Sequence, residues 1–337
     1  MLQYYLKVGD FMGKQYKIYI SSRSFGIYTE EAIRLLKSIG DVERNTYGRP
    51  LTEDELKHVI KDVDALIVGI DNVTDDVLKH ANRLKVLANH GVGLDNIDLE
   101  AATKRGIPVV YSPHANADSV ADFTLGLILA LLRRIVDAHL VTKAGGFRSR
   151  KFLGVELRDK VIGIIGFGQI GFRVAQRALG FGMKVITYDP YVADEVLAKF
   201  DAKRASLEEL LKNSDIVTIH VPLTGETRNL IGEKELKLMK KNAVLINTAR
   251  GGIVDENALY KALKEGWIAG AAVDVYEVEP PGRDFPLFKL DNVIVTPHIA
   301  FYTREAVRRM DMMITHDVVN VLQGKRPKNI ANPEVLK

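Results

Sequence analysis

Three glycines in the spacing G-x-G-x-x-G directly follow a short apolar segment of the chain. Val161–Ile165 (VIGII) is too brief for a helix and is typical of a strand buried on both faces of a parallel sheet. In the motif that follows, Gly166 permits a tight turn, Gly168 permits close approach of the backbone to a pyrophosphate, and Gly171 permits close packing of the next helix. Residues 172–179 have helical spacing, so the N–H groups at their start would face the phosphates. The pattern predicts a dinucleotide-binding turn.

An acidic side chain follows the next predicted strand, at residues 184–187. Asp189 lies about 20 residues past the glycines, where a carboxylate accepts hydrogen bonds from the ribose hydroxyls and repels a 2′-phosphate. No Arg or Lys follows Asp189 directly, although Lys199 and Lys203 lie further along. We therefore expect NAD rather than NADP as the cofactor. The alternative is a strand, turn and helix that carry three glycines by chance, with Asp189 a solvated strand-end residue; the agreement of strand, turn, helix and acid disfavours it.

Three more side chains that suit acid–base chemistry each follow a short apolar segment later in the chain. Arg250 has a bidentate guanidinium that fits a carboxylate or a ketone oxygen. His298 and Glu279 could pair, because a carboxylate fixes the tautomer of a histidine and keeps a proton available for a developing alkoxide. Taken singly, Arg250 would be a surface ion-pair residue and His298 a structural histidine. Together with the dinucleotide motif, the three predict an active site with a proton donor and an anion clamp.

A glycine-rich segment in the N-terminal half interrupts the run of strands and helices. Residues 89–98 (NHGVGLDNID) follow the strand predicted at 85–88, and Gly91 and Gly93 let the backbone approach a ligand closely. Ligands bind at the carboxyl ends of parallel strands, where consecutive N–H groups can hold a carboxylate. We expect a substrate carboxylate here; a glycine-rich turn without a ligand is the alternative.

The elements that would position these residues alternate between strand and helix, which is typical of parallel α/β sheets. Strands are predicted at residues 16–21, 65–68, 85–88, 107–111, 161–165, 184–187, 216–221, 243–247, 269–273 and 293–295. Helices are predicted at residues 29–39, 54–61, 75–80, 119–134, 172–179, 207–211, 234–239 and 255–264. The run 119–134 is apolar, but it is shorter than a lipid-spanning segment and contains Asp122, so we expect a buried helix that joins domains or subunits.

Length and composition bound the class of protein. At 337 residues the chain exceeds the usual single domain, so two domains are expected. The net charge of +4 is small for this length and predicts neither a nucleic-acid nor a membrane partner. Cysteine is absent, which excludes disulfides and thiolate metal sites and fits a reducing cytoplasm; no zinc-ligand spacing is present, so no metal is expected. Residues 1–15 lack the apolar core of a signal peptide and are expected to form an N-terminal extension.

Several motifs together resemble the D-isomer-specific 2-hydroxyacid dehydrogenases. They are the segment 89–98, GFGQIG from Gly166, TARGGIVDE from Thr248, DVYEVEPP from Asp274 and TPHIA from Thr296. The family implies an α/β fold with two doubly wound parallel-sheet domains, a flavodoxin-like substrate domain and a Rossmann NAD domain, and an active-site cleft between them. It implies a substrate domain at residues 16–115 plus 303–337, with a returning helix at 303–324, and an NAD domain at 116–302 that includes the helix 119–134. A homodimer formed largely through the nucleotide domains is also implied.

The resemblance further implies roles for individual residues. Arg250 would bind and polarise a 2-keto acid, and His298, paired with Glu279, would supply the proton while a hydride passes between the nicotinamide and the keto carbon. The residues implied at the NAD are Gly166, Gly168, Gln169, Ile170, Gly171, Asp189, His220, Val221, Pro222, Thr227, Thr248, Ala249, Arg250, Asp274 and His298. The residues implied at the substrate are Gly91, Val92, Gly93, Tyr111, Arg250, His298 and Tyr302. For the two tyrosines, packing at a domain interface is the alternative.

The short motifs that could indicate the substrate disagree with one another. The segments 151–157 (KFLGVEL) and 249–256 (ARGGIVDE) are similar to D-3-phosphoglycerate dehydrogenases, whereas YSP from Tyr111 and HIAFYT from His298 are similar to D-lactate dehydrogenases. A phosphorylated substrate would need extra cations, which Arg148 or Arg150 would supply only if their loop folds inward. We therefore expect a small 2-keto acid such as pyruvate, glyoxylate or hydroxypyruvate. A D-3-phosphoglycerate dehydrogenase is the first alternative, and an NAD(H)-sensing interaction protein, like the transcriptional corepressors that share the fold, is the second.

Overall fold

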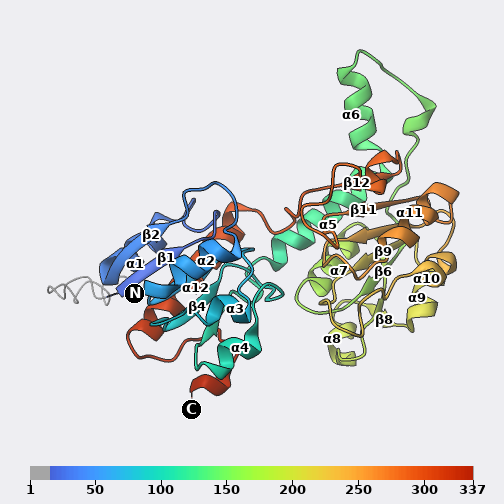
Figure 1. Cartoon of the computed structure of the whole chain (residues 1–337). Coiled ribbons are helices and arrows are strands. Elements are labelled where there is room, and N and C mark those ends of the chain that lie inside the picture. The colour runs from blue at the N-terminus through green and yellow to red at the C-terminus, as the bar shows by residue number, and fades with distance from the viewer. Residues whose placement is uncertain (1–15, 337) are drawn as a thin grey trace. The chain divides into compact units, whose positions relative to one another are not determined.

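The computed structural model describes residues 16–336, and the chain divides into two compact units. Unit 1 comprises residues 16–116 and 303–336 of the described chain, and unit 2 comprises residues 117–302. In Figure 1, unit 1 carries both the blue and the red segments, because it is built from the two ends of the chain. The extension expected at residues 1–15 lies outside the described residues.

Unit 1 is built on five parallel strands in the order β2-β1-β3-β4-β5. The strands are β1 (Tyr16–Ile20), β2 (Gly40–Arg44), β3 (Ala65–Val68), β4 (Val86–Asn89) and β5 (Val109–Val110). β3 and β4 are buried at every residue, as expected of inner strands that are covered on both faces. After β1 the chain adds β2 on one side and then returns to add β3 on the other. This reversal is the point of an open α/β sheet at which ligands bind, beyond the carboxyl ends of the strands.

Helices cover both faces of this sheet. They are α1 (Glu30–Ile39), α2 (Glu53–Val59), α3 (Asp75–Leu78), α4 (Leu99–Lys104) and α12 (Arg304–Leu322), with the 3₁₀ turns η2 (Ile60–Asp62) and η5 (Pro333–Leu336). One apolar core joins the sheet to α1 and α12 through residues that include Leu36 and Ile314. A second core joins the opposite face to α2, α3 and α4 through residues that include Leu56 and Val77. The returning helix α12 is therefore an integral part of unit 1.

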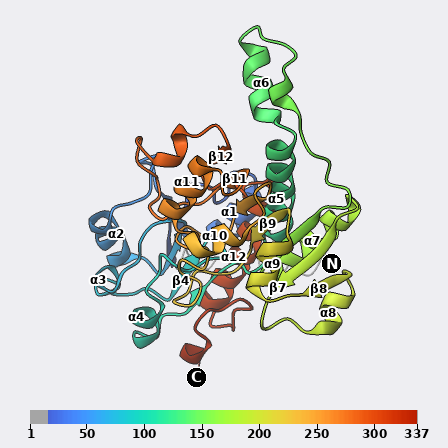
Figure 2. The same ribbon diagram turned by 90° about the vertical axis from the view of Figure 1, so that its right-hand side faces the viewer.

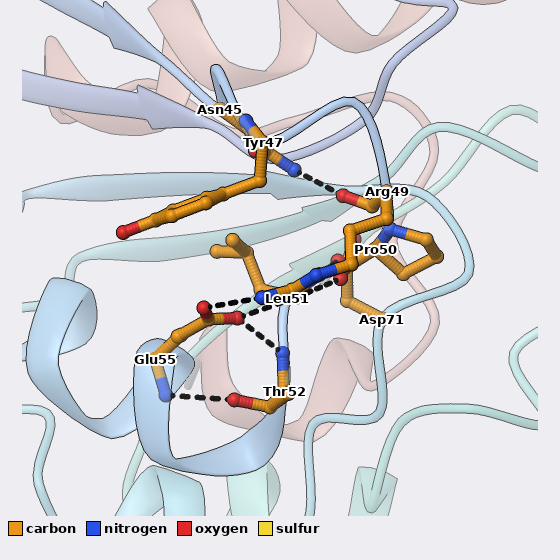
Figure 3. Close-up of polar contacts among 8 residues, drawn as sticks. All are labelled: Asn45, Tyr47, Arg49, Pro50, Leu51, Thr52, Glu55 and Asp71. Atoms are coloured by element: carbon orange, nitrogen blue, oxygen red, sulfur yellow. Dashed lines mark hydrogen bonds and ion pairs between the residues drawn. The ribbon is translucent and has the colours of Figure 1, made fainter.

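The loops at the carboxyl edge of β1 and β3 are braced by Asp71 and by an ion pair (Figure 3). Asp71, buried just past β3, accepts a hydrogen bond from the backbone N–H of Leu51 at 2.7 Å. It also accepts a hydrogen bond from Ser21 Oγ at 2.6 Å. Arg49 donates two hydrogen bonds to Glu55, at 2.7 and 2.8 Å, and this guanidinium is the main reason that the pKa of Glu55 falls to about 2. Glu55 also completes the capping box that begins α2. These contacts fasten the segment between β2 and α2 beside the strand reversal.

Unit 2 is built on seven parallel strands in the order β12-β11-β10-β9-β6-β7-β8. The strands are β6 (Val161–Ile165), β7 (Lys184–Tyr188), β8 (Ala202–Arg204), β9 (Ile216–Ile219), β10 (Val244–Asn247), β11 (Gly270–Val273) and β12 (Val293–Val295). β6 lies between β7 and β9, and the order of strands reverses there. A ligand is therefore expected beyond the carboxyl ends of β6 and β9.

Helices also cover both faces of the seven-stranded sheet. They are α5 (Ala117–Leu132), α6 (Ile135–Lys143), α7 (Gly171–Gly180), α8 (Asp194–Ala198), α9 (Leu207–Asn213), α10 (Glu233–Leu238) and α11 (Glu256–Glu265), with the 3₁₀ turns η3 (Arg150–Phe152) and η4 (Pro286–Lys289). One core packs α5 and α7 on the sheet through Ile128 and Val174, and another packs α9, α10 and α11 on the opposite face through Leu210 and Leu259. α6 buries no residue and projects from the rest of unit 2 (Figure 1, Figure 2). Across residues 16–336 no helix is long and apolar enough to cross a bilayer.

The fold class predicted from the sequence, two α/β units with parallel sheets, is confirmed. The sequence predicts no strand at β2, because β2 is an edge strand that buries only Gly40 and carries no apolar run. The short α4, α8 and β8 were not predicted either, and neither was α6. The helix predicted at 119–134 ends earlier: α5 stops at Leu132, and Arg134 adopts a left-handed φ of 53° before α6 begins. The strand predicted at 216–221 ends at Ile219, so His220 lies in the loop beyond it.

Candidate active site

The predicted residues of unit 2 gather at one edge of its sheet, because each follows the carboxyl end of a strand. β10, β11 and β12 are neighbours in the sheet, and Arg250, Glu279 and His298 follow them in that order. The glycine turn follows β6 and Asp189 follows β7, further along the same edge. The parallel sheet thus brings together side chains that are far apart in the sequence.

His298 and Glu279 are in direct contact. Nδ1 of His298 lies 2.7 Å from Oε2 of Glu279. The other carboxylate oxygen, Oε1, accepts a hydrogen bond from the backbone N–H of Tyr276 at 3.0 Å, so the carboxylate is held at both oxygens. His298 has a left-handed φ of 54°, a conformation that is uncommon outside glycine and that clusters at functional sites. The contact leaves Nε2 as the ring nitrogen that Glu279 does not engage.

The surroundings of Glu279 keep it charged. Burial on its own would raise the pKa of the Glu279 carboxyl, but the hydrogen bond and charge of His298, the N–H of Tyr276 and the charge of Arg250 together hold that pKa below its usual value of 4.5. An ionised carboxylate at this distance keeps a proton on Nδ1 of the histidine and directs Nε2 for proton transfer. The pair is therefore suited to general acid–base chemistry.

Arg250 lies in a tight segment that follows β10. Its Nη1 donates a hydrogen bond to the carbonyl of Ala249 at 2.7 Å. A Cβ atom at Gly251 would overlap the carbonyl of Tyr276, so only glycine lets these two loops pass so closely. This approach brings the Arg250 segment beside the loop that carries Glu279, in accord with the effect of the Arg250 charge on the Glu279 carboxyl.

The glycine turn after β6 has the geometry that a dinucleotide requires. Gly166 has a φ of 90°, and a Cβ there would lie 2.7 Å from Cγ1 of Val221 and 2.9 Å from the carbonyl of His220. A Cβ at Gly171 would overlap the carbonyl oxygen of Gly166, which shows how closely α7 packs on the turn. At Gly168, in contrast, nothing lies within 4 Å of an added Cβ. The turn therefore leaves open space at the one glycine whose backbone would face a pyrophosphate, and its residues fit NAD in this respect.

Asp189 lies beside the turn and is bonded to it. Its Oδ2 accepts a hydrogen bond from the backbone N–H of Phe167 at 2.7 Å, and its Oδ1 accepts from Tyr191 at 2.8 Å and Val192 at 3.1 Å. Arg204, on β8, donates to the carbonyl of Asp189 at 2.5 Å. The sequence predictions omitted this arginine, because it follows Asp189 only after α8 and is brought back by the sheet.

The other cofactor candidates lie around β9 and β10. His220 has Nε2 at 2.9 Å from Thr218 Oγ1, and burial lowers its pKa to about 3, so the ring is neutral. Its Nδ1 is buried and has no hydrogen-bond partner among the described residues, which leaves a polar atom that a ligand could satisfy. Thr227 donates to the carbonyl of Pro222 at 2.6 Å and closes the loop after β9. The hydroxyl of Thr248 lies 3.0 Å from that of Thr124, on α5.

Asp274 fastens the loop that carries His298. The carboxylate is buried and accepts hydrogen bonds from the hydroxyl of Thr296 at 2.6 Å and from the backbone N–H groups of Ile299 at 3.0 Å and Ala300 at 2.8 Å. These three donors lie on both sides of His298 in the sequence. Asp274, predicted as a cofactor residue, therefore also holds the histidine loop in place.

In unit 1 the glycine segment is tied down at its two ends. The carbonyl of Gly91 accepts hydrogen bonds from Ser112, from the backbone N–H at 3.0 Å and from Oγ at 2.9 Å. Asn89 Nδ2 donates to the carbonyl of Gly93. Gly91, Val92 and Gly93 are all partly exposed. The segment thus has a held backbone and is partly exposed, which is compatible with a carboxylate site.

The two predicted pocket tyrosines lie in different units. Tyr111, in unit 1, is partly buried, and its backbone N–H donates to the carbonyl of Asn329 at 3.2 Å. Tyr302, in unit 2, is 44% exposed and its ring packs edge-on against Phe301, whose ring in turn contacts that of His298. The ring of Tyr302 is therefore linked to His298 through the ring of Phe301.

The sequence predictions assigned no role to His90 and Asp311, which form a fully buried pair in unit 1. A signal was present for Asp311, because it occupies a buried position of α12 together with Val307, Ile314 and Val318. An acid at such a position of an amphipathic helix needs a partner. Among residues 16–336 no group of three or more His, Cys, Asp or Glu side chains could hold a metal ion.

Comparison with known proteins decides the family. Residues 125–300 match the model of the NAD-binding domain of the D-isomer-specific 2-hydroxyacid dehydrogenases. The chain belongs to this family. The match lies in unit 2, and the sequence prediction of an NAD-dependent oxidoreductase is confirmed at the level of the family.

Relatives of this dehydrogenase carry different substrate names. It is 47% identical to a D-3-phosphoglycerate dehydrogenase of Methanocaldococcus jannaschii over 90% of this chain, but it spans only 57% of the length of that relative. It is 46% identical to a glyoxylate reductase of Aeropyrum pernix, with 91% of this chain and 94% of the relative covered. A solved D-lactate dehydrogenase from Aquifex aeolicus, complexed with NAD and lactic acid, is 32% identical and has a TM-score of 0.82, with 94% of this chain and 99% of that chain covered.

Proposed function

We propose that this dehydrogenase reduces a small, unphosphorylated 2-keto acid with NADH, or oxidises the matching D-2-hydroxy acid with NAD. Glyoxylate, pyruvate and hydroxypyruvate are the candidate acids. The observation that carries the proposal is the contact between His298 and Glu279, with the charge of Arg250 acting on the same carboxyl. It supports a proton donor, an orienting carboxylate and an anion clamp at one edge of one sheet.

Each of the three residues has one task in this proposal. Arg250 binds the keto acid through its guanidinium fork and polarises the keto oxygen. His298 gives a proton from Nε2 to the oxygen as the alkoxide develops, and takes a proton from the hydroxyl in the reverse reaction. Glu279 holds Nδ1 of His298 and so fixes its tautomer. NADH, when bound, supplies the hydride, so that one hydride and one proton convert the ketone into the alcohol.

The proposed NAD site follows the strand ends of unit 2. Gly168 and the backbone N–H groups of Gln169 and Ile170 would hold the pyrophosphate at the start of α7. Asp189 would take the ribose hydroxyls through the lone pairs that its backbone donors leave free. The other residues assigned to the cofactor are Gly166, Gly171, His220, Val221, Pro222, Thr227, Thr248, Ala249, Arg250, Asp274 and His298.

Unit 1 is proposed as the substrate domain, with residues 91–93 as the site of the acid's carboxylate. The segments at the carboxyl ends of β1, β3 and β4, residues 21–24, 69–72 and 89–96, contain a single Lys or Arg. This is Arg23, whose Nη1 donates to the carbonyl of Gly48 at 3.1 Å. A phosphate would call for more cationic partners than these three segments offer, and Arg49, in the loop after β2, is already bound to Glu55.

We also propose Tyr111, in unit 1, and Tyr302, in unit 2, as residues that bind the substrate. A tyrosine beside a short keto acid offers both a hydroxyl and an apolar ring. The ring contacts from Tyr302 through Phe301 to His298 support this role for Tyr302. If the Tyr111→Phe and Tyr302→Phe variants both turn over every acid at the rate of the unaltered enzyme, neither tyrosine hydroxyl binds the substrate.

A homodimer is part of the proposal, and α6 with the loop after it is the surface that supports it. Leu140 on α6 is 60% exposed and Phe147 in the loop is 78% exposed, although both are apolar. We call α6 and the loop after it the arm. The end of the arm is joined to α5 by the N–H of Val155, which donates a hydrogen bond to the carbonyl of Leu132 at 3.0 Å. An apolar arm that projects from one domain is suited to pack on a second copy of the chain. In sedimentation experiments we expect the unaltered chain to be a dimer and the Leu140→Glu variant to be a monomer. An unaltered chain that sediments as a monomer would refute the proposal.

The test of the activity is NADH oxidation at neutral pH with glyoxylate, pyruvate, hydroxypyruvate and 3-phosphohydroxypyruvate, with NADPH run in parallel. Turnover of an unphosphorylated acid is the expected result. Turnover of the phosphorylated acid alone would make the protein a D-3-phosphoglycerate dehydrogenase. No turnover of any acid, with NADH still bound, would favour the NAD(H)-sensing alternative.

A further inference from the structure

A buried histidine–carboxylate pair lies next to the glycine segment of unit 1. Nε2 of His90 is 2.9 Å from Oδ1 of Asp311, and neither side chain has any solvent exposure. His90 directly precedes Gly91, whereas Asp311 lies on the returning helix α12. The pair therefore joins the two ends of the chain at the base of the segment proposed to hold the substrate carboxylate.

The ring of His90 is held on its other side as well. Its Nδ1 lies 3.0 Å from Ser22 Oγ and 3.2 Å from Ser24 Oγ, both in the loop after β1. The ring packs edge-on against Phe25, which is fully buried. Contacts with β1, α12 and the core thus leave the imidazole one orientation.

Asp311 has few partners for a buried acid. Among the described residues no donor is aligned as a hydrogen bond with either carboxylate oxygen, so the 2.9 Å contact with Nε2 of His90 is its compensation. Burial of a carboxylate with so little support costs stability, and an apolar pair of similar volume would cost less. A pair of this kind is better explained by the geometry that it imposes than by the stability that it adds.

His90 is directly followed by the glycine segment, and the backbone of both is hydrogen-bonded to neighbouring strands and loops. The backbone N–H of His90 donates to the carbonyl of Val68 at 2.8 Å, and the next carbonyl, of Gly91, accepts from both the N–H and the hydroxyl of Ser112. The fixed ring of His90 thus lies at the start of a segment whose first two residues are hydrogen-bonded to β3 and to Ser112. The amides of residues 91–93 are those that would face the substrate carboxylate.

We propose that His90 and Asp311 are positioning residues that set the orientation of the N–H groups of residues 91–93. The inference rests on the proposed function, because it requires those amides to bind the carboxylate of the acid. Neither side chain is exposed, so neither would touch the substrate. Loss of the pair should weaken ground-state and transition-state binding alike, which raises KM for the acid and leaves kcat nearly unchanged.

Two variants separate positioning from stability. Asp311→Asn keeps the shape and removes the charge, and the double variant His90→Leu, Asp311→Leu replaces the pair by apolar side chains that suit burial. Both should raise KM for the keto acid about tenfold, with kcat and KM for NADH within about twofold of the unaltered enzyme. The double variant should do so without a loss of melting temperature.

Asp64→Asn is the matched control. Asp64 is also a buried carboxylate of unit 1, but it precedes β3 and accepts hydrogen bonds from the N–H of Lys17 at 2.9 Å and from Arg83 at 2.7 Å, at the opposite edge of the sheet. This variant should lower the melting temperature and leave KM for the acid unchanged. A rise in KM that matched that of Asp311→Asn would show a general effect of destabilisation and would overturn the proposal.

Gly91→Ala separates failure of this inference from failure of the proposed site. Its Cβ would approach Asn89 Nδ2 at 3.2 Å, so the added methyl group pushes on the side chain that donates to the carbonyl of Gly93. If Gly91→Ala raises KM for the acid while both pair variants leave it unchanged, residues 91–93 bind the carboxylate and the pair is only structural. If Gly91→Ala also leaves KM unchanged while the enzyme turns over, the carboxylate binds elsewhere and the inference fails with the site.

Discussion

Replacement of Glu279 by Gln tests the link between the carboxylate and the proposed proton donor. The substitution keeps the shape of the side chain and an oxygen that can accept from the N–H of Tyr276. It removes the negative charge that lies 2.7 Å from Nδ1 of His298. The expected result is a lower kcat/KM for the keto acid with little change in NADH affinity.

The size of the effect follows from the distance and the exposure of the pair. Two unit charges 2.7 Å apart attract by about 1.5 kcal/mol at the dielectric constant of water and by about 6 kcal/mol at an effective value of ~20. The two side chains are 37% and 36% exposed, so solvent screening places the interaction in the lower part of this range. A loss of about 1.5–3 kcal/mol in transition-state stabilisation corresponds to roughly a 10- to 100-fold lower kcat/KM.

The assay is the initial rate of NADH oxidation for the unaltered enzyme, Glu279→Gln and Glu277→Gln. Glu277 is the control, because it lies two residues away but its carboxylate is 56% exposed and lies 3.6 Å from Arg228. Glu277→Gln should stay within about twofold of the unaltered enzyme. The reasoning is refuted if Glu279→Gln also keeps its kcat/KM within twofold, since the carboxylate would then not act through His298.

The pH dependence of the same variant gives a second readout. Burial would raise the pKa of Glu279, but its hydrogen bond with His298 and the other contacts outweigh burial and lower that pKa. The carboxylate is therefore ionised at any pH above the usual carboxyl pKa of 4.5 and protonates only below it. The pair is therefore intact at neutral pH and is lost as the pH falls through the lowered pKa. The advantage of the unaltered enzyme over Glu279→Gln should therefore persist down to about pH 5 and disappear only as the pH falls below the usual carboxyl value of 4.5. An advantage already lost at about pH 6 would mean that the Glu279 carboxylate is not the group that controls the difference.

His298→Gln should lower kcat about 10²- to 10⁴-fold and leave NADH affinity, measured by fluorescence titration, within about twofold; an equal loss of both would make His298 a structural residue. Asp189→Asn keeps an acceptor for the N–H of Phe167 but removes the charge, so the preference for NADH over NADPH in kcat/KM should fall about tenfold, and an unchanged ratio would remove Asp189 from the ribose site. Gly171→Ala should lower the free energy of unfolding in urea by about 1–3 kcal/mol, because its Cβ would overlap the carbonyl of Gly166. Gly168→Ala should leave unfolding unchanged, since its Cβ meets nothing within 4 Å, yet weaken NADH binding about tenfold; full NADH affinity would argue against a pyrophosphate at this turn.

The dinucleotide turn and the alternation of strands and helices along the chain could be predicted from the sequence because the physics there is local. Gly166, Gly168 and Gly171 lie within six residues, and each has a steric reason that needs only the strand before it and the helix after it. The buried strands are short apolar runs, which parallel sheets covered on both faces produce. Where burial was partial the prediction failed: β2 is a polar edge strand and α6 is a helix with no buried residue.

The contacts between these elements required the tertiary structure. The sequence placed His298 and Glu279 after neighbouring strands as candidates for a pair, but the 2.7 Å contact, the second bond from Tyr276 and the fastening of the loop by Asp274 depend on the register of β11 and β12. Arg204 approaches Asp189 only because β8 pairs with β7.

The pair of His90 and Asp311 shows the limit of the sequence most clearly. Residue types and spacing determined the class of fold, the cofactor turn and the residues able to do chemistry, because those depend on steric and chemical properties of short segments. Which distant side chains share one buried place was decided by the packing of α12 against β1 and β4, since a histidine and an aspartate at opposite ends of the chain carry no mark of each other in the sequence. Only the tertiary structure shows that the buried carboxylate of Asp311 has no aligned hydrogen-bond donor among the described residues, which is why its contact with His90 is needed.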